Sequence, residues 1–361
     1  MTRKKILIIG KNPPPFYGTS IWFETLQKAN WSDDFELLFF DNNVNKKLNS
    51  LGKISFSKLL FNIKLYFEFK KYLKKHKVHL VLIPFSQTTL GFVKDSIYIN
   101  IAKKRTKTLL ILHGANFLNW SKSASSLIRK YITKTFKNTS GIIVLGENLK
   151  CLFDDYFKNE LIFSVPNGLT INVDSVEKSH KKLKLIYLGN LQKSKGIKDL
   201  IDAIALIDNS KIELEVIGQW RDEITKKYCI DKRSELNLNV HFLGPKYGSV
   251  KLEFLANADL FIFTPNKPEG HPLVLIEAMA NSLPIISSNQ GAISESVIEG
   301  KNGFIVKSNS PNEIAEKINF FIENEVIRIK MGEKSKEIYL NNFTSEKMIE
   351  NYEKIFYTLV K

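Results

Sequence analysis

Two carboxylates, Glu269 and Glu277, lie eight positions apart in the stretch PNKPEGHPLVLIEAMANSLPIIS. Glu269 falls in a segment rich in Pro and Gly, whereas Glu277 falls inside an apolar run that is typical of a buried helix. A purely structural helix would carry Leu or Ala at position 277, because a buried carboxylate needs polar partners. The pattern therefore predicts that both carboxylates face a ligand.

The residues around these carboxylates are suited to a nucleotide sugar. Pro272 is expected at the first helical position, so the Glu277 side chain would lean back toward the start of the helix. There it could accept hydrogen bonds from the vicinal hydroxyls of a ribose, and Glu269 could do the same for a sugar ring. Amides of the turn could hold phosphate oxygens. This predicts donor-binding roles for Gly270, His271, Pro272, Leu273 and Glu277.

Other candidate residues follow apolar, strand-like runs. Gly18 opens a predicted helix after the first run, and His113 ends the run KTLLILHG. A histidine there is more often a packing residue, but the end of a strand is also where ligands bind. The stretch LGNLQKSKGIKDL contains Gly189, Asn190 and the pair Lys195-Gly196, which would open a helix. The lysine charge and the free helix amides together predict a diphosphate site.

These residues require a scaffold of parallel strands, and the chain predicts one. Strand-like and helical runs alternate along all 361 residues, with six strands in each half. The pattern predicts an α/β fold with two Rossmann-like, doubly wound domains that face a central cleft. We expect an N-terminal domain over 1–168, a linker over 169–182 and a C-terminal domain over 183–344. The helix over about 345–361 is expected to pack back on the first domain.

The charge is unevenly distributed. Residues 1–170 hold 27 Lys and Arg against 11 Asp and Glu, a net charge of +16, whereas residues 171–361 hold 26 of each. The first half is thus expected to face an anionic partner, such as a membrane surface or a pyrophosphate-bearing acceptor. The densest segment, residues 55–77, mixes lysines with aromatic residues. It fits an interfacial helix and equally an ordinary crossover helix with a solvated lysine face.

The location is predicted from what the chain lacks. No apolar run reaches the length of a membrane span, and the N-terminal apolar run is too short for a signal peptide. Two widely separated cysteines give no disulfide framework. We therefore expect a cytoplasmic protein.

The stretch from Pro268 to Val306 resembles the signature region of family four of the retaining glycosyltransferases, which have the GT-B fold. Two glutamates bracket seven residues, a Gly-x-x-x-Glu segment runs from Gly291 to Glu295, and an Asn-Gly turn follows. Gly18, His113 and Lys195-Gly196 extend the resemblance over the whole chain. One departure is Asn190, where the family usually has an arginine; Lys193 and Arg221 are possible substitutes.

The resemblance implies catalytic roles for His113, Lys195 and Glu269. It implies transfer of a sugar from a nucleoside-diphosphate donor, with UDP as the expected nucleotide, to a lipid-linked glycan or oligosaccharide acceptor. The acceptor would attack the face that the diphosphate leaves, while Lys195 and helix amides stabilise the leaving charge. No Asp-x-Asp triplet occurs, so we expect no metal and no other cofactor.

Two other function classes fit parts of the sequence. The chain could be a sugar-nucleotide-binding scaffold that lost catalysis with the arginine. It could also bind nucleic acid, but it has no recognisable module for that and its basic excess follows a domain rather than one helix face. We expect an enzyme that sits peripherally on the inner face of the cytoplasmic membrane, with anionic lipid rather than nucleic acid as its partner.

Overall fold

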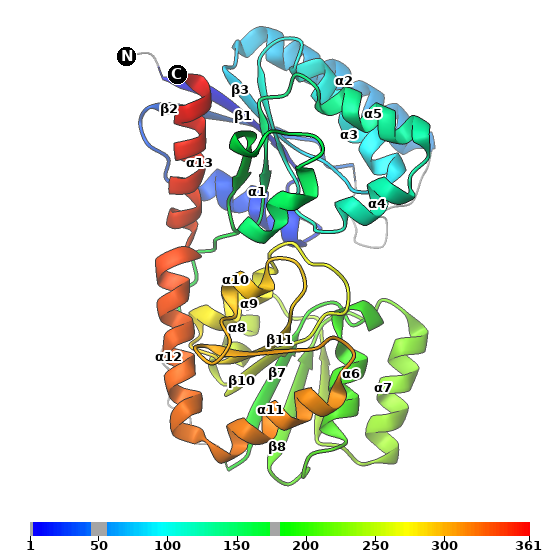
Figure 1. The fold of residues 1–361 in the computed structure, drawn as a ribbon, viewed down its shortest axis with the longest axis vertical. Coiled ribbons are helices and arrows are strands. Elements are labelled where there is room, and N and C mark those ends of the chain that lie inside the picture. Colours follow the sequence, from blue (N-terminus) through cyan, green and yellow to red (C-terminus); the bar gives the residue numbers. More distant parts are fainter. Residues whose placement is uncertain (1–2, 45–55, 174–180) are drawn as a thin grey trace. The chain divides into compact units, whose positions relative to one another are not determined.

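The computed structural model describes residues 3–44, 56–173 and 181–361. The chain divides into two compact units (Figure 1). The first unit comprises Met1–Asn167 and Ser345–Lys361, and the second comprises Gly168–Thr344. The middle of the predicted linker, residues 174–180, lies outside the described residues, as does Ser55 at the start of the lysine-rich segment.

The first unit is a six-stranded parallel sheet with the order β2-β1-β3-β4-β5-β6. Its central strands are largely buried, as expected when helices cover both faces. Helix α3 packs beside both α2 and α5, and α13 contacts β3. The elements are β1 (Lys4–Gly10), α1 (Gly18–Lys28), β2 (Phe35–Asp41), α2 (Phe56–His76), β3 (Leu80–Pro84), α3 (Thr89–Ala102), β4 (Lys107–Ile111), α4 (Phe117–Ser123), α5 (Ser126–Phe136), β5 (Gly141–Val144), β6 (Ile162–Ser164) and α13 (Ser345–Val360).

The second unit is also a six-stranded parallel sheet, with the order β12-β11-β10-β7-β8-β9. Helix α6 packs against α7 and α11, and α9 packs against α8 and α12. The elements are β7 (Leu183–Leu188), α6 (Ile197–Ile204), β8 (Ile212–Ile217), α7 (Glu223–Glu235), β9 (Val240–Gly244), α8 (Gly248–Ala256), β10 (Leu260–Phe263), α9 (Leu273–Ala280), β11 (Ile285–Ser288), α10 (Ile293–Ser296), β12 (Gly303–Val306), α11 (Pro311–Glu323) and α12 (Glu325–Asn342).

The predicted fold class is confirmed, since all twelve strand-like runs form strands of two doubly wound parallel sheets. Two local predictions were off by about one residue. Pro272 is the N-cap of α9 and not its first helical residue. Lys195 belongs to a short 3-10 turn, Lys193–Lys195, and α6 begins after Gly196. In the described part of the chain, no helix combines the length and apolar character needed to cross a membrane.

Candidate functional site

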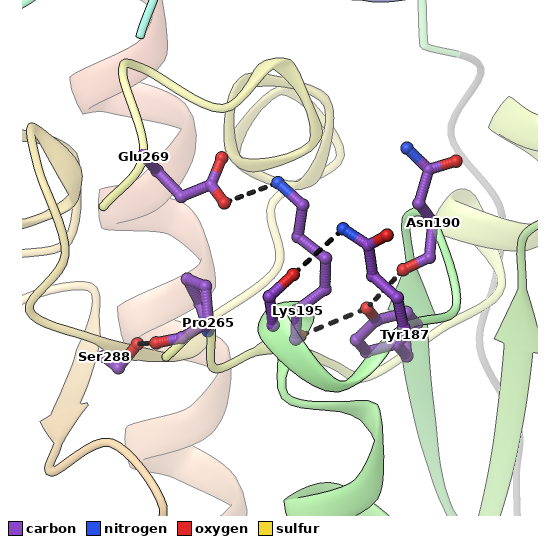
Figure 2. A network of polar contacts seen from close by, with 8 residues as sticks. Tyr187, Asn190, Lys195, Pro265, Glu269 and Ser288 are labelled. Atoms are coloured by element: carbon purple, nitrogen blue, oxygen red, sulfur yellow. Dashed lines mark hydrogen bonds and ion pairs between the residues drawn. The ribbon is translucent and has the colours of Figure 1, made fainter. Parts of the chain in front are cut away.

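The order of the second sheet places two predicted residues at one point. Strands β7 and β10 are neighbours, but the chain leaves them toward opposite edges of the sheet. Ligands bind outside the carboxyl ends of parallel strands at such a switch point. Lys195 follows β7 and Glu269 follows β10, and the Lys195 ammonium forms an ion pair with Glu269 Oε1 (Figure 2). The structure thus joins two residues that are 74 positions apart.

Polar contacts fix the loop that carries Lys195. The Tyr187 hydroxyl, at the end of β7, donates to the Lys195 carbonyl oxygen at 3.2 Å and lies 3.3 Å from that of Asn190 (Figure 2). Burial raises the pKa of Tyr187 well above its ordinary value, so the hydroxyl stays protonated as a donor. The Asn266 side chain donates to the Lys193 carbonyl at 3.1 Å, which ties this loop to the one after β10.

Two glycines allow the loops to approach closely. Gly196 has φ +77°, and a Cβ there would lie 2.0 Å from the Thr264 carbonyl oxygen. Gly291 has φ +63°, and its Cβ would lie 1.5 Å from the Glu269 carbonyl oxygen. Only glycine satisfies both the left-handed backbone and the contact with another main chain. Gly291, the first residue of the Gly-x-x-x-Glu segment, therefore packs directly against the main chain of Glu269.

Gly291→Ala is expected to displace the Glu269 loop, to lower stability by about 2 kcal/mol or more, and to abolish most turnover. Gly300→Ala is the matched control, because Gly300 has φ +71° and no described atom within 4 Å of the added Cβ. Gly300→Ala should lower the free energy of unfolding by about 1–2 kcal/mol, through the strain of a left-handed backbone alone. Its activity should be unchanged. Thermal melting and donor turnover measure both variants. Equal effects at the two positions would show that the contact with Glu269 has no special role.

Glu277 lies in α9 with its side chain 7% exposed. Its Oε1 accepts a hydrogen bond of 2.5 Å from Lys251 Nζ, on α8. Its Oε2 is buried and has no hydrogen-bond partner among the described residues. A buried carboxylate oxygen without a donor costs free energy unless a ligand supplies one. The carboxylate is thus oriented by Lys251 and keeps one buried acceptor oxygen without a donor among the described residues.

The turn before α9 places its residues in two ways. Gly270 is buried, and its carbonyl accepts from the Ala292 amide at 3.0 Å. Pro272 caps the helix, so Leu273 lies in the first turn, where amides have no intrahelical carbonyl to bond.

The His271 ring instead packs inside the unit, with Nε2 2.6 Å from Ser296 Oγ. Burial lowers its pKa to about 4, so the ring is neutral near pH 7. The predicted roles of these residues stay predictions.

Gly189 and Asn190 form the turn after β7, beside the turn after β8. The Gly189 carbonyl approaches Gly218 so closely that a Cβ on Gly218 would lie 1.8 Å from it. The Asn190 side chain is exposed and its Oδ1 accepts a hydrogen bond of 3.0 Å from Arg221 Nε. Lys193 and Arg221 are the two cations that could substitute for the family arginine. The structure places the Arg221 side chain in contact with Asn190.

Two predicted residues belong to the first unit. Gly18 begins α1, and no described atom lies within 4 Å of a Cβ built there, so packing does not require glycine. The His113 ring lies edge-on to Trp22, with centroids 4.5 Å apart. Its Nε2 is buried without a partner in the described part of the chain, and burial lowers its pKa to about 3. His113 is therefore a neutral hydrogen-bonding group near pH 7.

Sequence reasoning missed Lys251 and Tyr187. Lys251 lies in an ordinary helical stretch, and no motif signals that it contacts a residue 26 positions away. Tyr187 has the sequence context of an ordinary apolar strand residue.

Among the described residues, no group of three or more His, Cys, Asp or Glu side chains is arranged to hold a metal ion.

The fold and site define a class of protein. Two six-stranded, doubly wound parallel sheets have the architecture of the GT-B glycosyltransferases. Solved structures share this fold over nearly the whole chain. The Anabaena protein HepE in complex with UDP superposes with a TM-score of 0.72 at 18% identity, covering 98% of this chain and 100% of that one. The apo form of the lipopolysaccharide outer core galactosyltransferase WaaB gives 0.70 at 19% identity, covering 98% and 99%.

The sequence comparisons give the family. Residues 170–338 match the model of the glycosyl transferases group 1. The N-acetyl-alpha-D-glucosaminyl L-malate synthase of Bacillus anthracis is 30% identical over 271 residues, which cover 72% of this chain and 69% of that protein. The capsular polysaccharide biosynthesis glycosyltransferase CapM of Staphylococcus aureus is 30% identical over 252 residues, 66% of this chain and 61% of that protein. The chain belongs to the group 1 glycosyltransferases and is a glycosyltransferase.

Proposed function

We propose that the chain is a retaining glycosyltransferase that transfers a sugar from UDP-sugar to a lipid-linked glycan in surface polysaccharide assembly. The observation that supports this most is the Glu277 carboxylate, which is buried, oriented by Lys251 and left with one acceptor oxygen that has no donor among the described residues. A ribose hydroxyl supplies the missing donor. The UDP bound to the structural neighbour HepE and the polysaccharide role of the relative CapM support the nucleotide and the pathway.

The chemistry follows from the charges at the switch point. When the bond between the sugar and the diphosphate breaks, negative charge develops on the leaving phosphate oxygen. In this proposal, Lys195 and the first-turn amides of α9 stabilise that charge. That phosphate oxygen takes the proton of the attacking acceptor hydroxyl on the same face of the sugar, which retains the anomeric configuration. Glu269 holds Lys195 and accepts from sugar hydroxyls.

A thermal-shift screen of sugar nucleotides tests donor binding. UDP-sugars are expected to raise the melting temperature because they bind the folded chain only. The matched nucleoside and free sugar should have little effect. A panel in which no nucleoside diphosphate sugar shifts the melting curve would contradict the proposal.

We further propose that transfer needs no divalent metal, because cationic side chains and helix amides take its place beside the diphosphate. Turnover should therefore be unchanged after EDTA treatment and dialysis. Loss of activity that added manganese restores would overturn this part of the proposal.

The acceptor side of the proposal rests on α2 of the first unit. This crossover helix buries Leu65, Phe69 and Leu73. Its outer face, however, is apolar as well as basic. Leu60, Ile63 and Phe67 are 42–64% exposed, and the exposed Lys70, Lys71, Lys74 and Lys75 follow them. We propose that this face rests on the anionic inner leaflet of the cytoplasmic membrane, where lipid-linked acceptors lie.

Replacing Lys70, Lys71, Lys74 and Lys75 by Gln is expected to reduce binding to acidic vesicles at least tenfold, since each lysine near the surface contributes roughly 1 kcal/mol. The double change Leu60→Ser and Phe67→Ser should weaken the binding that remains at high salt, when charge is screened. Ile224→Ser is the control, because Ile224 is 85% exposed on α7 of the second unit. Liposome sedimentation decides the question. Equal binding to neutral and acidic vesicles, or preferential binding of duplex DNA, would contradict a membrane partner.

A further inference from the structure

The ionic groups described so far at the carboxyl edge of the second sheet cancel one another. Lys195 is paired with Glu269, and Lys251 is paired with Glu277. A nucleoside diphosphate brings at least two negative charges to this edge, and helix amides offer only about half a positive charge. A tightly held diphosphate therefore calls for a further cation that is not already neutralised by a carboxylate.

Arg221 is such a cation. It lies in the turn after β8, next to the turn after β7, and an isolated bridge between Leu191 and Trp220 joins the two turns. The Arg221 amide donates to the Leu191 carbonyl at 3.0 Å, and its Nε donates to Asn190 Oδ1 at 3.0 Å. No carboxylate in the described part of the chain forms an ion pair with Arg221, and the terminal nitrogens of its guanidinium have no partner there.

A chain of contacts connects Arg221 with Lys195. Asn190 accepts from Arg221 through its side chain, and its carbonyl lies 3.3 Å from the Tyr187 hydroxyl, which also donates to the Lys195 carbonyl. The two cations are thus carried by one hydrogen-bonded unit at the ends of neighbouring strands. A guanidinium held at Nε keeps its two terminal nitrogens as a fork, which matches two oxygens of a phosphate.

Two other cations of this edge are not held in this way. Lys193 and Lys267 are exposed, and no hydrogen bond or ion pair fixes either side chain to the described residues. A flexible lysine loses more conformational entropy when it binds than a guanidinium that is already positioned. Arg221 is therefore the better-placed cation.

We infer that Arg221, positioned by Asn190, binds the diphosphate of the donor as its second cation beside Lys195. This inference rests on the proposed function, since it assumes a nucleoside-diphosphate donor at this edge. It also explains how the chain binds the diphosphate with asparagine at position 190. The asparagine side chain supports an arginine that comes from the next loop.

Calorimetric titration of the full chain with UDP, UMP and uridine tests the inference. Arg221→Met is expected to weaken UDP binding roughly 10- to 100-fold, the usual effect of losing a charge-assisted hydrogen bond. Uridine affinity should not change, which also shows that the variant is folded. Arg221→Lys should recover part of the affinity for UDP, because it restores the charge but not the fork.

Two further variants sharpen the test. Lys267→Met, which removes an exposed cation of the same edge, should bind UDP like the wild type. Asn190→Ala should weaken UDP binding less than Arg221→Met, because it removes the support and leaves the charge. Wild-type affinity for UDP in Arg221→Met, or an equal loss for UDP and uridine, would overturn the role of Arg221. If the wild type itself binds none of UDP, GDP and ADP, the proposed function fails, and that result differs from a failure of Arg221 alone.

Discussion

Lys195→Met is expected to lower turnover about 100-fold or more while changing the KM for the donor far less. The reason is that charge on the leaving phosphate is larger in the transition state than in the bound donor, so a fixed cation stabilises the former more. The ion pair with Glu269 holds the ammonium in place before the donor binds. Steady-state kinetics with the donor concentration varied separate the two parameters.

Two controls belong to the Lys195 experiment. Lys193→Met removes an exposed lysine from the same short turn and should leave turnover unchanged. Lys195→Met also leaves Glu269 without its cation, so Lys195→Met with Glu269→Gln shows whether an unpaired carboxylate causes the loss. Recovery of turnover in the double variant, or a defect confined to the KM, would show that Lys195 does not act on the leaving group.

Glu277→Ala is expected to weaken donor binding by about 1–3 kcal/mol, or roughly 5- to 150-fold, because a ribose hydroxyl loses its buried acceptor. The structure adds a sharper expectation. Because Oε2 has no donor among the described residues, the wild type is expected to bind UDP more tightly than 2′-deoxy-UDP or 3′-deoxy-UDP, whichever lacks the hydroxyl that donates to Oε2. In Glu277→Ala, the three nucleotides should bind with nearly equal affinity.

Lys251 supplies the control for that prediction. Lys251→Met keeps the Glu277 carboxylate but removes the ammonium that orients it, so we expect weaker UDP binding with some discrimination between the nucleotides retained. Melting curves of both variants check that the helices still pack. Unchanged UDP affinity in Glu277→Ala would mean that Glu277 does not face the ribose.

The sequence predicts the fold well because parallel strands that are buried on both faces are mostly apolar and alternate with helices. That pattern depends on local composition, which a single chain displays directly. It also predicts which residues follow each strand. The positions of Lys195 and Glu269 at the ends of β7 and β10 follow from this rule together with the order of the strands.

The side-chain contacts could not be predicted in the same way. The pairing of Lys251 with Glu277 depends on how α8 packs against α9, and the contact of Arg221 with Asn190 depends on the neighbouring turns of β7 and β8. His271 shows the converse, since it lies in the predicted motif but its ring packs against Ser296. A motif indicates which residues share a turn, whereas tertiary packing decides which atoms face a ligand.

The most direct test of transfer is the release of UDP from the UDP-sugar that the chain binds, with a lipid extract of the organism that encodes it as the acceptor. The wild type is expected to release UDP at a rate that rises with the amount of lipid, and Lys195→Met should release it at least about 100-fold more slowly. A wild-type chain that binds the sugar nucleotide but releases no UDP above the Lys195→Met level would contradict catalysis and favour a binding scaffold.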